Sequence, residues 1–374
     1  MTDLAWPFVP QDALDMSFSQ ATSILQTPLT EQRSLLVTTP RIAMRATYLL
    51  PYASAELARN LIAATTESDD YQLYVPAHPW AVRVGDRLAG AVSHNIGFES
   101  AWYDTDTPVL VYNGTIGELV TATGPVSGGT LFTTALTQSI PNAFVAPAFA
   151  AFARNPSTSE KLYGVRSLSV TFIGDAVTDL REGLQVVSGG FPTFPYRSLA
   201  SPARTSIDAA TRVFDDLGPA WATVVRRNAE RGRVLVWSFL RNLEDTTFRS
   251  AFGRLMQLRG ACVPFTNAEG IAAASVVGIA GSIVTIQNVG MYLDPPAFFS
   301  LVELDGTVRV FKVSSVVDGG STENVTLETA PGLTAGEVTG ASRVDLMRLS
   351  DGTVDLTLSQ RDYKLTLRTT RCLS

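Results

Sequence analysis

Apolar and polar positions alternate in short runs along the chain, and this pattern predicts a mainly β protein. Segments such as "RIAMRATYLL" (41–50) and "YKLTLRTT" (363–370) alternate over most of their length, and Gly, Pro, Asn or Asp separate many of them. Alternation of this kind is typical of strands that bury one face. Strands do not alternate regularly with helices, so we expect antiparallel sheets and no parallel one.

Two segments have the apolar spacing of an amphipathic helix that packs on a sheet. We expect each helix to bury one stripe of side chains, Leu57, Leu61 and Ala64 in the first helix and Phe248, Phe252 and Leu255 in the second. Residues 206–218 form a third candidate helix, and residues 12–26 are its weaker counterpart near the N-terminus.

Similar segments recur in the same order in the two halves of the chain. Residues 46–64 match residues 237–256, and the dipeptide Val-Pro follows each segment, at 75–76 and at 263–264. Hairpins are predicted at 109–123 and 300–314, where Asn113-Gly114 and Asp305-Gly306 are the residues that a type I′ turn requires. These matches indicate two copies of one module.

The repeat sets the predicted fold class and domain boundaries. We expect a mainly β protein in which an antiparallel β-sandwich module, with one packed helix, is duplicated in tandem. The first module covers residues 1–183 with an insert at about 80–150, and the second covers 184–374 with an insert at about 266–347. Each insert is predicted to form a small β-barrel that shares few contacts with the main core.

Composition and charge narrow the classes of function. Apolar residues make up 45% of the 374 residues, but no run of 18 consecutive apolar residues predicts a membrane span. Residues 1–187 carry 10 basic and 17 acidic side chains, a net charge of −7; the remaining 19 basic and 18 acidic side chains give +1. Neither half is strongly basic, which weighs against sequence-specific nucleic-acid binding. Two cysteines and an N-terminus without a basic leader favour folding in a reducing cytosol.

Few side chains have a spacing that predicts catalysis or metal binding. His78 and His94 are the only histidines, and the two cysteines lie far apart in the sequence. The acidic cluster at 67–70 falls where a helix ends and a strand begins, which is typical of a solvated turn. We therefore expect no enzyme activity, and no catalytic, metal or cofactor site.

The segment "TEQRSLLVTTPR" (30–41), followed by a strand, an amphipathic helix and a Val-Pro strand, resembles the distal tail proteins of siphophage-like tailed bacteriophages. The segments "RVLVWSFLRNLEDTTFRSAFGRLMQLRGACVPF" and "GIAGSIVTIQNVG" are similar to later parts of that tail-tip family. The chain departs from the family pattern at Pro264-Phe265, which lacks the usual Trp, and at Ile42, which follows Arg41 where a second Arg is usual.

This resemblance implies a tail-tube-like fold and a structural protein of the virion, made in the host cytoplasm and located at the tail tip. It implies a homo-oligomeric ring that joins the tail tube protein to the hub or baseplate proteins, without a cofactor or a membrane, and wide enough for DNA to pass. Three chains would present six similar modules in such a ring; six chains are the alternative.

Glu31, Arg33 and Arg41 are the candidate interface residues, since they carry the charges of the family-like segment. Glu31 and Arg33 would either begin a solvated strand or form a charged pair between subunits. Two other functions remain open. A receptor- or glycan-binding tail-tip protein would use loop aromatics such as Trp80, Trp102 and Tyr103. A wall-degrading enzyme would need paired carboxylates, which the sequence does not bring together.

Overall fold

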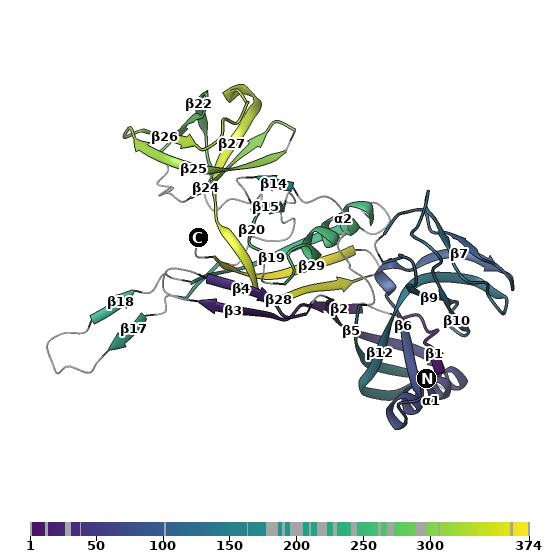
Figure 1. The fold of residues 1–374 in the computed structure, drawn as a ribbon. Coiled ribbons are helices and arrows are strands. Elements are labelled where there is room, and N and C mark those ends of the chain that lie inside the picture. Colours follow the sequence, from purple (N-terminus) through teal and green to yellow (C-terminus); the bar gives the residue numbers. More distant parts are fainter. Residues whose placement is uncertain are drawn as a thin grey trace.

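The computed structural model describes most of the chain, and in the described part it is mainly β, with two α-helices (Figure 1). The described residues are 2–11, 14–26, 31–37, 39–100, 102–162, 164–176, 186–188, 191–194, 205–208, 211–214, 223–226, 230–240, 245–260, 263–267, 273–288, 297–305, 307–359 and 362–372. The predicted module boundary at 183/184 lies outside these ranges.

The first half of the chain has one helix between two groups of strands. Its elements are β1 (Thr2–Ala5), β2 (Leu14–Ser19), β3 (Thr22–Gln26), β4 (Glu31–Leu35), β5 (Arg41–Pro51), α1 (Tyr52–Glu67), β6 (Tyr71–Pro76), the 3-10 turn η1 (His78–Trp80), β7 (Val82–Arg87), β8 (Ser93–Asn95), β9 (Pro108–Tyr112), β10 (Gly117–Thr121), β11 (Thr130–Phe132), β12 (Ile140–Leu162) and β13 (Val165–Asp175).

The second half has a similar succession of elements. These are β14 (Val186–Ser188), β15 (Phe191–Phe194), β16 (Thr205–Asp208), β17 (Thr211–Phe214), β18 (Thr223–Arg226), β19 (Glu230–Leu240), α2 (Asp245–Met256), β20 (Phe265–Asn267), β21 (Ala273–Ala274), β22 (Val276–Ala280), β23 (Ile283–Gln287), β24 (Phe298–Glu303), β25 (Val308–Asp318), β26 (Thr322–Leu327), the 3-10 turn η2 (Ala335–Glu337), β27 (Val338–Val344), β28 (Leu346–Leu358) and β29 (Asp362–Arg371).

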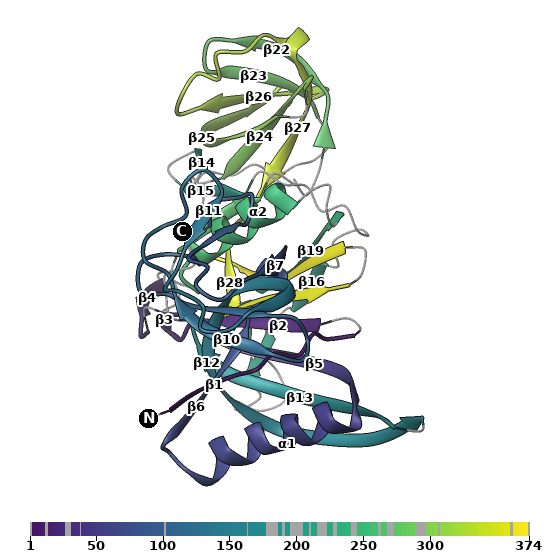
Figure 2. The same cartoon turned by 90° about the vertical axis from the view of Figure 1, so that its right-hand side faces the viewer.

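One hydrogen-bonded sheet runs through both halves. The first half contributes neighbouring strands in the order β6-β12-β13-β5, and the second contributes β20-β28-β29-β19. Strand β2 joins them because it pairs with β5 on one edge and with β28 on the other. The sheet is mostly antiparallel, as predicted; at its margins β1 pairs with β6 and β15 pairs with β20 in parallel. Figure 2 shows α1 lying beside β5 and β13.

The two weaker helix predictions, at 12–26 and 206–218, are wrong in the described residues. The first range holds strands β2 and β3, and the second holds β16 and β17. In β2 the apolar Leu14, Met16 and Phe18 are buried, whereas Asp15 is exposed and Ser17 half-buried between them. That spacing has the period of two that suits a strand, and partners on both edges stabilise it.

The predicted buried face is confirmed for α2 and partly wrong for α1. Phe248, Phe252 and Leu255 are all buried. In α1, however, Leu57 is 43% exposed, and the buried positions are Ala55, Ala58 and Ile62. The small alanines let the backbone of α1 approach its sheet closely, so this helix does not need its leucines as its main contact.

The two inserts differ in how they pack. Within the described residues, Val109, Val111 and Val145 of the first insert belong to the same buried cluster as Trp6 and Tyr48. The expectation of a separate barrel with few contacts to the main core is therefore wrong for this insert. Strands β7 and β9 both pair with the first part of β12, which continues directly into the main sheet.

The second insert has a core of its own. Strands β21 to β27 form a seven-stranded sheet in the order β21-β27-β24-β25-β26-β23-β22. It curls around a separate buried cluster that includes Val284, Phe299, Leu301 and Val325. In Figure 1 this insert projects from the body at the top of the view.

Both predicted hairpins are present, but their turns are longer than the two-residue type I′ turn. Tyr112 pairs with Gly117, so four residues connect β9 to β10, and the Asn113 side-chain oxygen accepts hydrogen bonds from the backbone N–H of Thr115 and Ile116 at 3.0 Å each. Four residues also separate β24 from β25, and Asp305 accepts from Thr307 N–H at 2.8 Å. Gly306 lies outside the described residues.

We expect hydrogen exchange to separate the two inserts. Amides of β9 should exchange in the same slow class as those of β5, because both strands enclose one core. Amides of β23 and β26 should form a second class that opens without the main sheet. Exchange mass spectrometry on the intact chain measures both, and equal protection of β23 and β5 at every denaturant concentration would contradict the separation.

Candidate assembly surface

The three predicted interface residues lie on two separate pieces of the fold. Glu31 and Arg33 are on β4, which forms a two-stranded hairpin with β3 in which Glu31 faces Gln26 and Arg33 faces Ile24. Arg41 is the first residue of β5, at the end of the main sheet nearest that hairpin in sequence. The structure thus places two of the candidates on a hairpin and the third on the main sheet.

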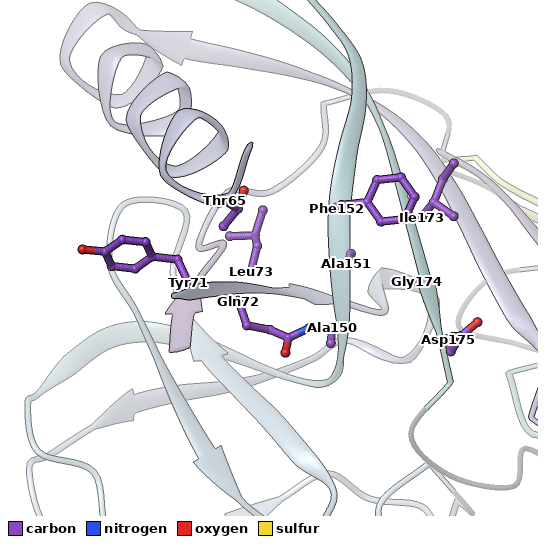
Figure 3. Close-up of a pocket in the computed structure, with 10 residues that line it drawn as sticks. All are labelled: Thr65, Tyr71, Gln72, Leu73, Ala150, Ala151, Phe152, Ile173, Gly174 and Asp175. Atoms are coloured by element: carbon purple, nitrogen blue, oxygen red, sulfur yellow. The ribbon is translucent and has the colours of Figure 1, made fainter. Parts of the chain in front are cut away.

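Arg41 forms an exposed ion pair at the edge of a shallow pocket. Its Nε lies 3.6 Å from Asp175 Oδ1 of β13, and the two side chains are 68% and 65% exposed. Asp175 also lines a pocket of about 330 Å³ between the end of α1 and strands β6, β12 and β13 (Figure 3). Tyr71 and Phe152 line it too, and Phe152 is 57% exposed. An open ion pair of this kind contributes little stability and remains available to a partner.

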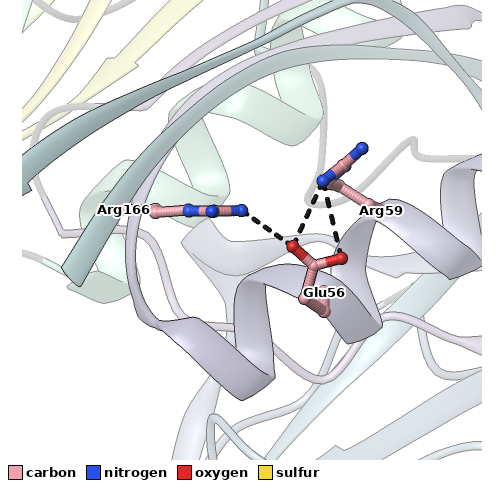
Figure 4. Close-up of polar contacts among 3 residues, drawn as sticks. All are labelled: Glu56, Arg59 and Arg166. Carbon is pink, nitrogen blue, oxygen red and sulfur yellow. Dashed lines mark hydrogen bonds and ion pairs between the residues drawn. The ribbon is translucent and has the colours of Figure 1, made fainter. Parts of the chain in front are cut away.

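A second charged group fixes α1 to the sheet. Glu56 Oε1 accepts hydrogen bonds from Arg166 Nη1 of β13 at 2.7 Å and from Arg59 Nη1 at 3.1 Å (Figure 4). The Arg166 guanidinium also lies over the Tyr52 ring, 4.4 Å from its centroid. This pairing orients the first turns of α1, where the N-cap Pro51 makes no side-chain cap hydrogen bond.

The three aromatic residues considered for glycan binding are buried, so that assignment is wrong. Trp80 and Tyr103 have no exposed surface, and Trp102 is also buried. The Trp80 and Trp102 rings lie 4.6 Å apart, and Tyr103 donates a hydrogen bond from its hydroxyl to the Trp80 carbonyl oxygen at 3.1 Å. Their segments have loop-like composition, but the rings complete the core between the first insert and α2.

Both histidines are buried, His94 in the first insert and His78 in the turn η1 just before it. His78 Nδ1 lies 3.0 Å from the Tyr112 hydroxyl, and His94 Nε2 lies 3.1 Å from Thr133 Oγ1. Burial, together with the positive charge of Arg87, lowers the pKa of His94 from 6.5 to about 4. Burial of the two histidines could not be predicted from local sequence, because their polar partners come from other segments of the chain.

The buried His94 predicts an acid-sensitive insert. Its pKa is lower in the folded chain than the ordinary 6.5. The free energy of unfolding should therefore have its full value above pH 6.5 and should fall as the pH drops toward 4. Each pH unit in that window costs about 1.4 kcal/mol for one such group. Denaturant unfolding at pH 7 and pH 5 should show a smaller loss for His94→Gln than for the unmodified chain; equal losses would contradict the assignment.

The described part of the chain has neither a metal-ligand group nor a membrane-spanning helix. Among its residues, no group of three or more His, Cys, Asp or Glu side chains could hold a metal ion. None of the helices in this part is both long enough and apolar enough to cross a membrane.

One surface that the sequence did not predict is the second part of β12. Residues 154–161, "RNPSTSEK", are all exposed, although they belong to a strand of the main sheet. Residues 157–160 pair with β13 on one edge, and within the described residues no strand pairs with the other edge. A run of Ser and Thr after a proline was the only sign of it in the sequence.

Comparison of the chain with known protein families and with curated protein sequences gave no match.

Proposed function

We propose that the two halves are tandem copies of one antiparallel β-sandwich-type module with a packed helix. Element order supports this: β5, α1, β6, β12 and β13 correspond in turn to β19, α2, β20, β28 and β29. Strand neighbours support it as well, because β6-β12-β13-β5 and β20-β28-β29-β19 have the same connectivity. Each module also has an insert between the strand after its helix and its last two strands.

We further propose that the protein is a structural component of a bacteriophage virion. It would form a ring at the distal end of the tail and join the tail tube to the tail-tip hub or baseplate. The tail tube protein and the hub proteins would be its partners, besides copies of itself. The resemblance of residues 30–41 and of the second half to distal tail proteins supplies the specific role.

The proposal of a ring rests mainly on the way in which the two modules are joined within one chain. Strand β2 of the first module adds to β28 of the second, so two modules already share a continuous sheet side by side. Repeating one such head-to-tail contact generates a closed ring when the rotation closes. Three chains would supply six modules, and we favour three over six because the modules are paired within each chain.

Electron microscopy of the purified protein, alone and with a co-expressed tail tube protein, tests this role. We expect rings with threefold symmetry and about six similar lobes, and rings capping one end of tubes. Particles that stay single chains at high concentration, and that also leave the tubes uncapped, would overturn the proposal. Rings with sixfold mass would retain the role and correct the copy number.

A further inference from the structure

We propose that β16 of one chain pairs with the open edge of β12 in a second copy of the chain, so that residues 205–208 and 155–158 lie side by side between subunits. This contact rests on the proposed ring and names the surface that would close it. The contact inside the chain between β2 and β28 serves as the template.

The template is a strand from one module that fills an edge of the other. On one side β2 pairs with β5, with Ser19 opposite Arg41. On its other side β2 pairs with the second part of β28, with Ser17 opposite Asp355 and Phe18 opposite Val354. On this part of β28, Val354, Leu356 and Leu358 are buried in the main core.

Strand β16 holds the place of β2 in the second module. It pairs antiparallel with β19, with Asp208 opposite Glu230. Asp208 follows Ser19 by 189 positions, and Glu230 follows Arg41 by the same 189 positions, so the two pairings have one register. Strand β15 follows β1 at the same distance. Within the described residues β16 pairs only with β19, which leaves its other edge without a strand.

Strand β12 holds the place of β28 in the first module, and its corresponding edge is open. Ser157 of β12 faces Ser169, the fifth residue of β13, and Asp355 of β28 faces Thr366, the fifth residue of β29. Ser157 therefore occupies the position of Asp355. The part of β28 that pairs with β2 alternates between half-buried and buried residues, whereas residues 154–161 of β12 are all exposed.

The chemistry of this edge suits a strand that is covered only on assembly. Main-chain hydrogen bonds would supply the contact, as in β-strand addition. Polar side chains and Pro156, which lies in the irregular part of the pairing with β13, would keep the free chain from pairing nonspecifically. A second copy fits best because its β16 pairs with β19 in the same register in which the template strand β2 pairs with β5.

The segment that follows β2 provides a further correspondence between the two modules. After β2, Gln20 and Thr22 lie against the turn after α2, where a Cβ added at Gly260 would come within 2.8 Å of the Gln20 carbonyl oxygen and 3.0 Å of Thr22. The corresponding place in the first module is the turn after α1, beside the pocket that Tyr71 and Phe152 line (Figure 3). Chain emerging from a neighbour's β16 would enter there. In Figure 1 the following hairpin, β17–β18, extends away from the rest of its own chain.

Cysteine cross-linking tests the contact directly. With Cys262→Ala and Cys372→Ala as background, Ser157→Cys and Ser206→Cys place one thiol on each proposed partner strand. Their template equivalents, Ser17→Cys and Asp355→Cys, are a matched control, because these residues face each other within one chain. Directly opposed strand positions have the Cβ separation that a disulfide needs.

On oxidation, the 157/206 pair should convert the chain into a covalent species of about 120 kDa, three times the 40.1 kDa chain. Each single variant should lose that species, and the 17/355 control should link within the chain and add no mass. Light scattering on the unmodified chain provides a measurement that does not depend on the variants.

The outcomes separate this contact from the proposed ring. Rings in which the 157/206 cysteines stay unlinked, while the control pair oxidises, would overturn the contact and leave the proposed function standing. A chain that scatters as a monomer at every soluble concentration, and does not link at 157/206 on tail tubes, would overturn both. An open ladder of ever longer products would overturn the closed ring of three.

Discussion

Replacing Phe252 by Ala should lower the free energy of unfolding by about 3–5 kcal/mol, the range found for large aromatic side chains removed from cores. Phe252 is only 1% exposed, and its ring packs edge-on against Phe18 at 4.8 Å and against Trp80 at 4.9 Å. These partners come from the first half of the chain. The substitution therefore removes a contact between the two halves of the chain as well as apolar burial in α2.

Urea unfolding followed by circular dichroism measures this loss, and Leu57→Ala is the matched control on the other helix. Leu57 is 43% exposed, so its truncation should change stability by roughly 0.5 kcal/mol or less. A cost below about 1 kcal/mol for Phe252→Ala would show that α2 is not packed between the modules. A large cost for Leu57→Ala in the free chain would contradict its exposure.

Strand content and the order of elements could be predicted from the sequence, because both depend on local patterns. The alternation in residues 41–50 predicts a strand without knowledge of the fold, and the turn residues at 113–114 predict a hairpin in the same way. The face of α2 was predictable for a related reason, since Phe248, Phe252 and Leu255 are its large apolar side chains. In α1 the same spacing marked Leu57, and the prediction failed because alanines make the contact with the sheet.

The joining of the two halves of the chain could not be predicted, because it depends on pairing between distant residues. Leu14 faces Leu358 across 344 positions of sequence, and no local pattern in residues 14–19 specifies that partner. The run of alternating residues was short enough to be mistaken for a weak helix. Whether each insert packs against the main core could not be predicted either, for the same reason.

The candidate surface was only partly predictable. Charged residues such as Arg33 and Arg41 can be picked out by type, and the structure places them at the hairpin and at the start of β5. A strand edge without a neighbour presents backbone C=O groups, which every residue carries, and backbone N–H groups, which every residue except proline carries. The sequence "PSTSE" at 156–160 therefore shows that this strand is polar, but not that one of its edges lacks a neighbour.

Phe18→Ala should also cost about 3–5 kcal/mol, and its effect should not add to that of Phe252→Ala. Phe18 is 1% exposed on β2 and contacts Phe252, Trp80 and Trp102, with ring centroids between 4.8 and 6.2 Å apart. Removing either phenyl ring leaves the other with fewer partners, so the second truncation should cost less than it does alone. A coupling free energy of roughly 0.5–3 kcal/mol is the expected size for residues in contact.

The double-mutant cycle of Phe18 and Phe252 needs a reference pair that shares no contact, and Phe299 supplies it. Phe299 is buried in the separate core of the second insert, so Phe18→Ala and Phe299→Ala should add to within about 0.5 kcal/mol. Coupling confined to the first pair means that an N-terminal strand and a helix more than 200 positions later stabilise each other directly. Additive effects in both pairs would mean that Phe18 and Phe252 do not stabilise each other across the two halves of the chain. In that case the aromatic ring contact between β2 and α2 would not help to join the two halves, whereas the main-chain pairing of β2 with β28 would still hold them together.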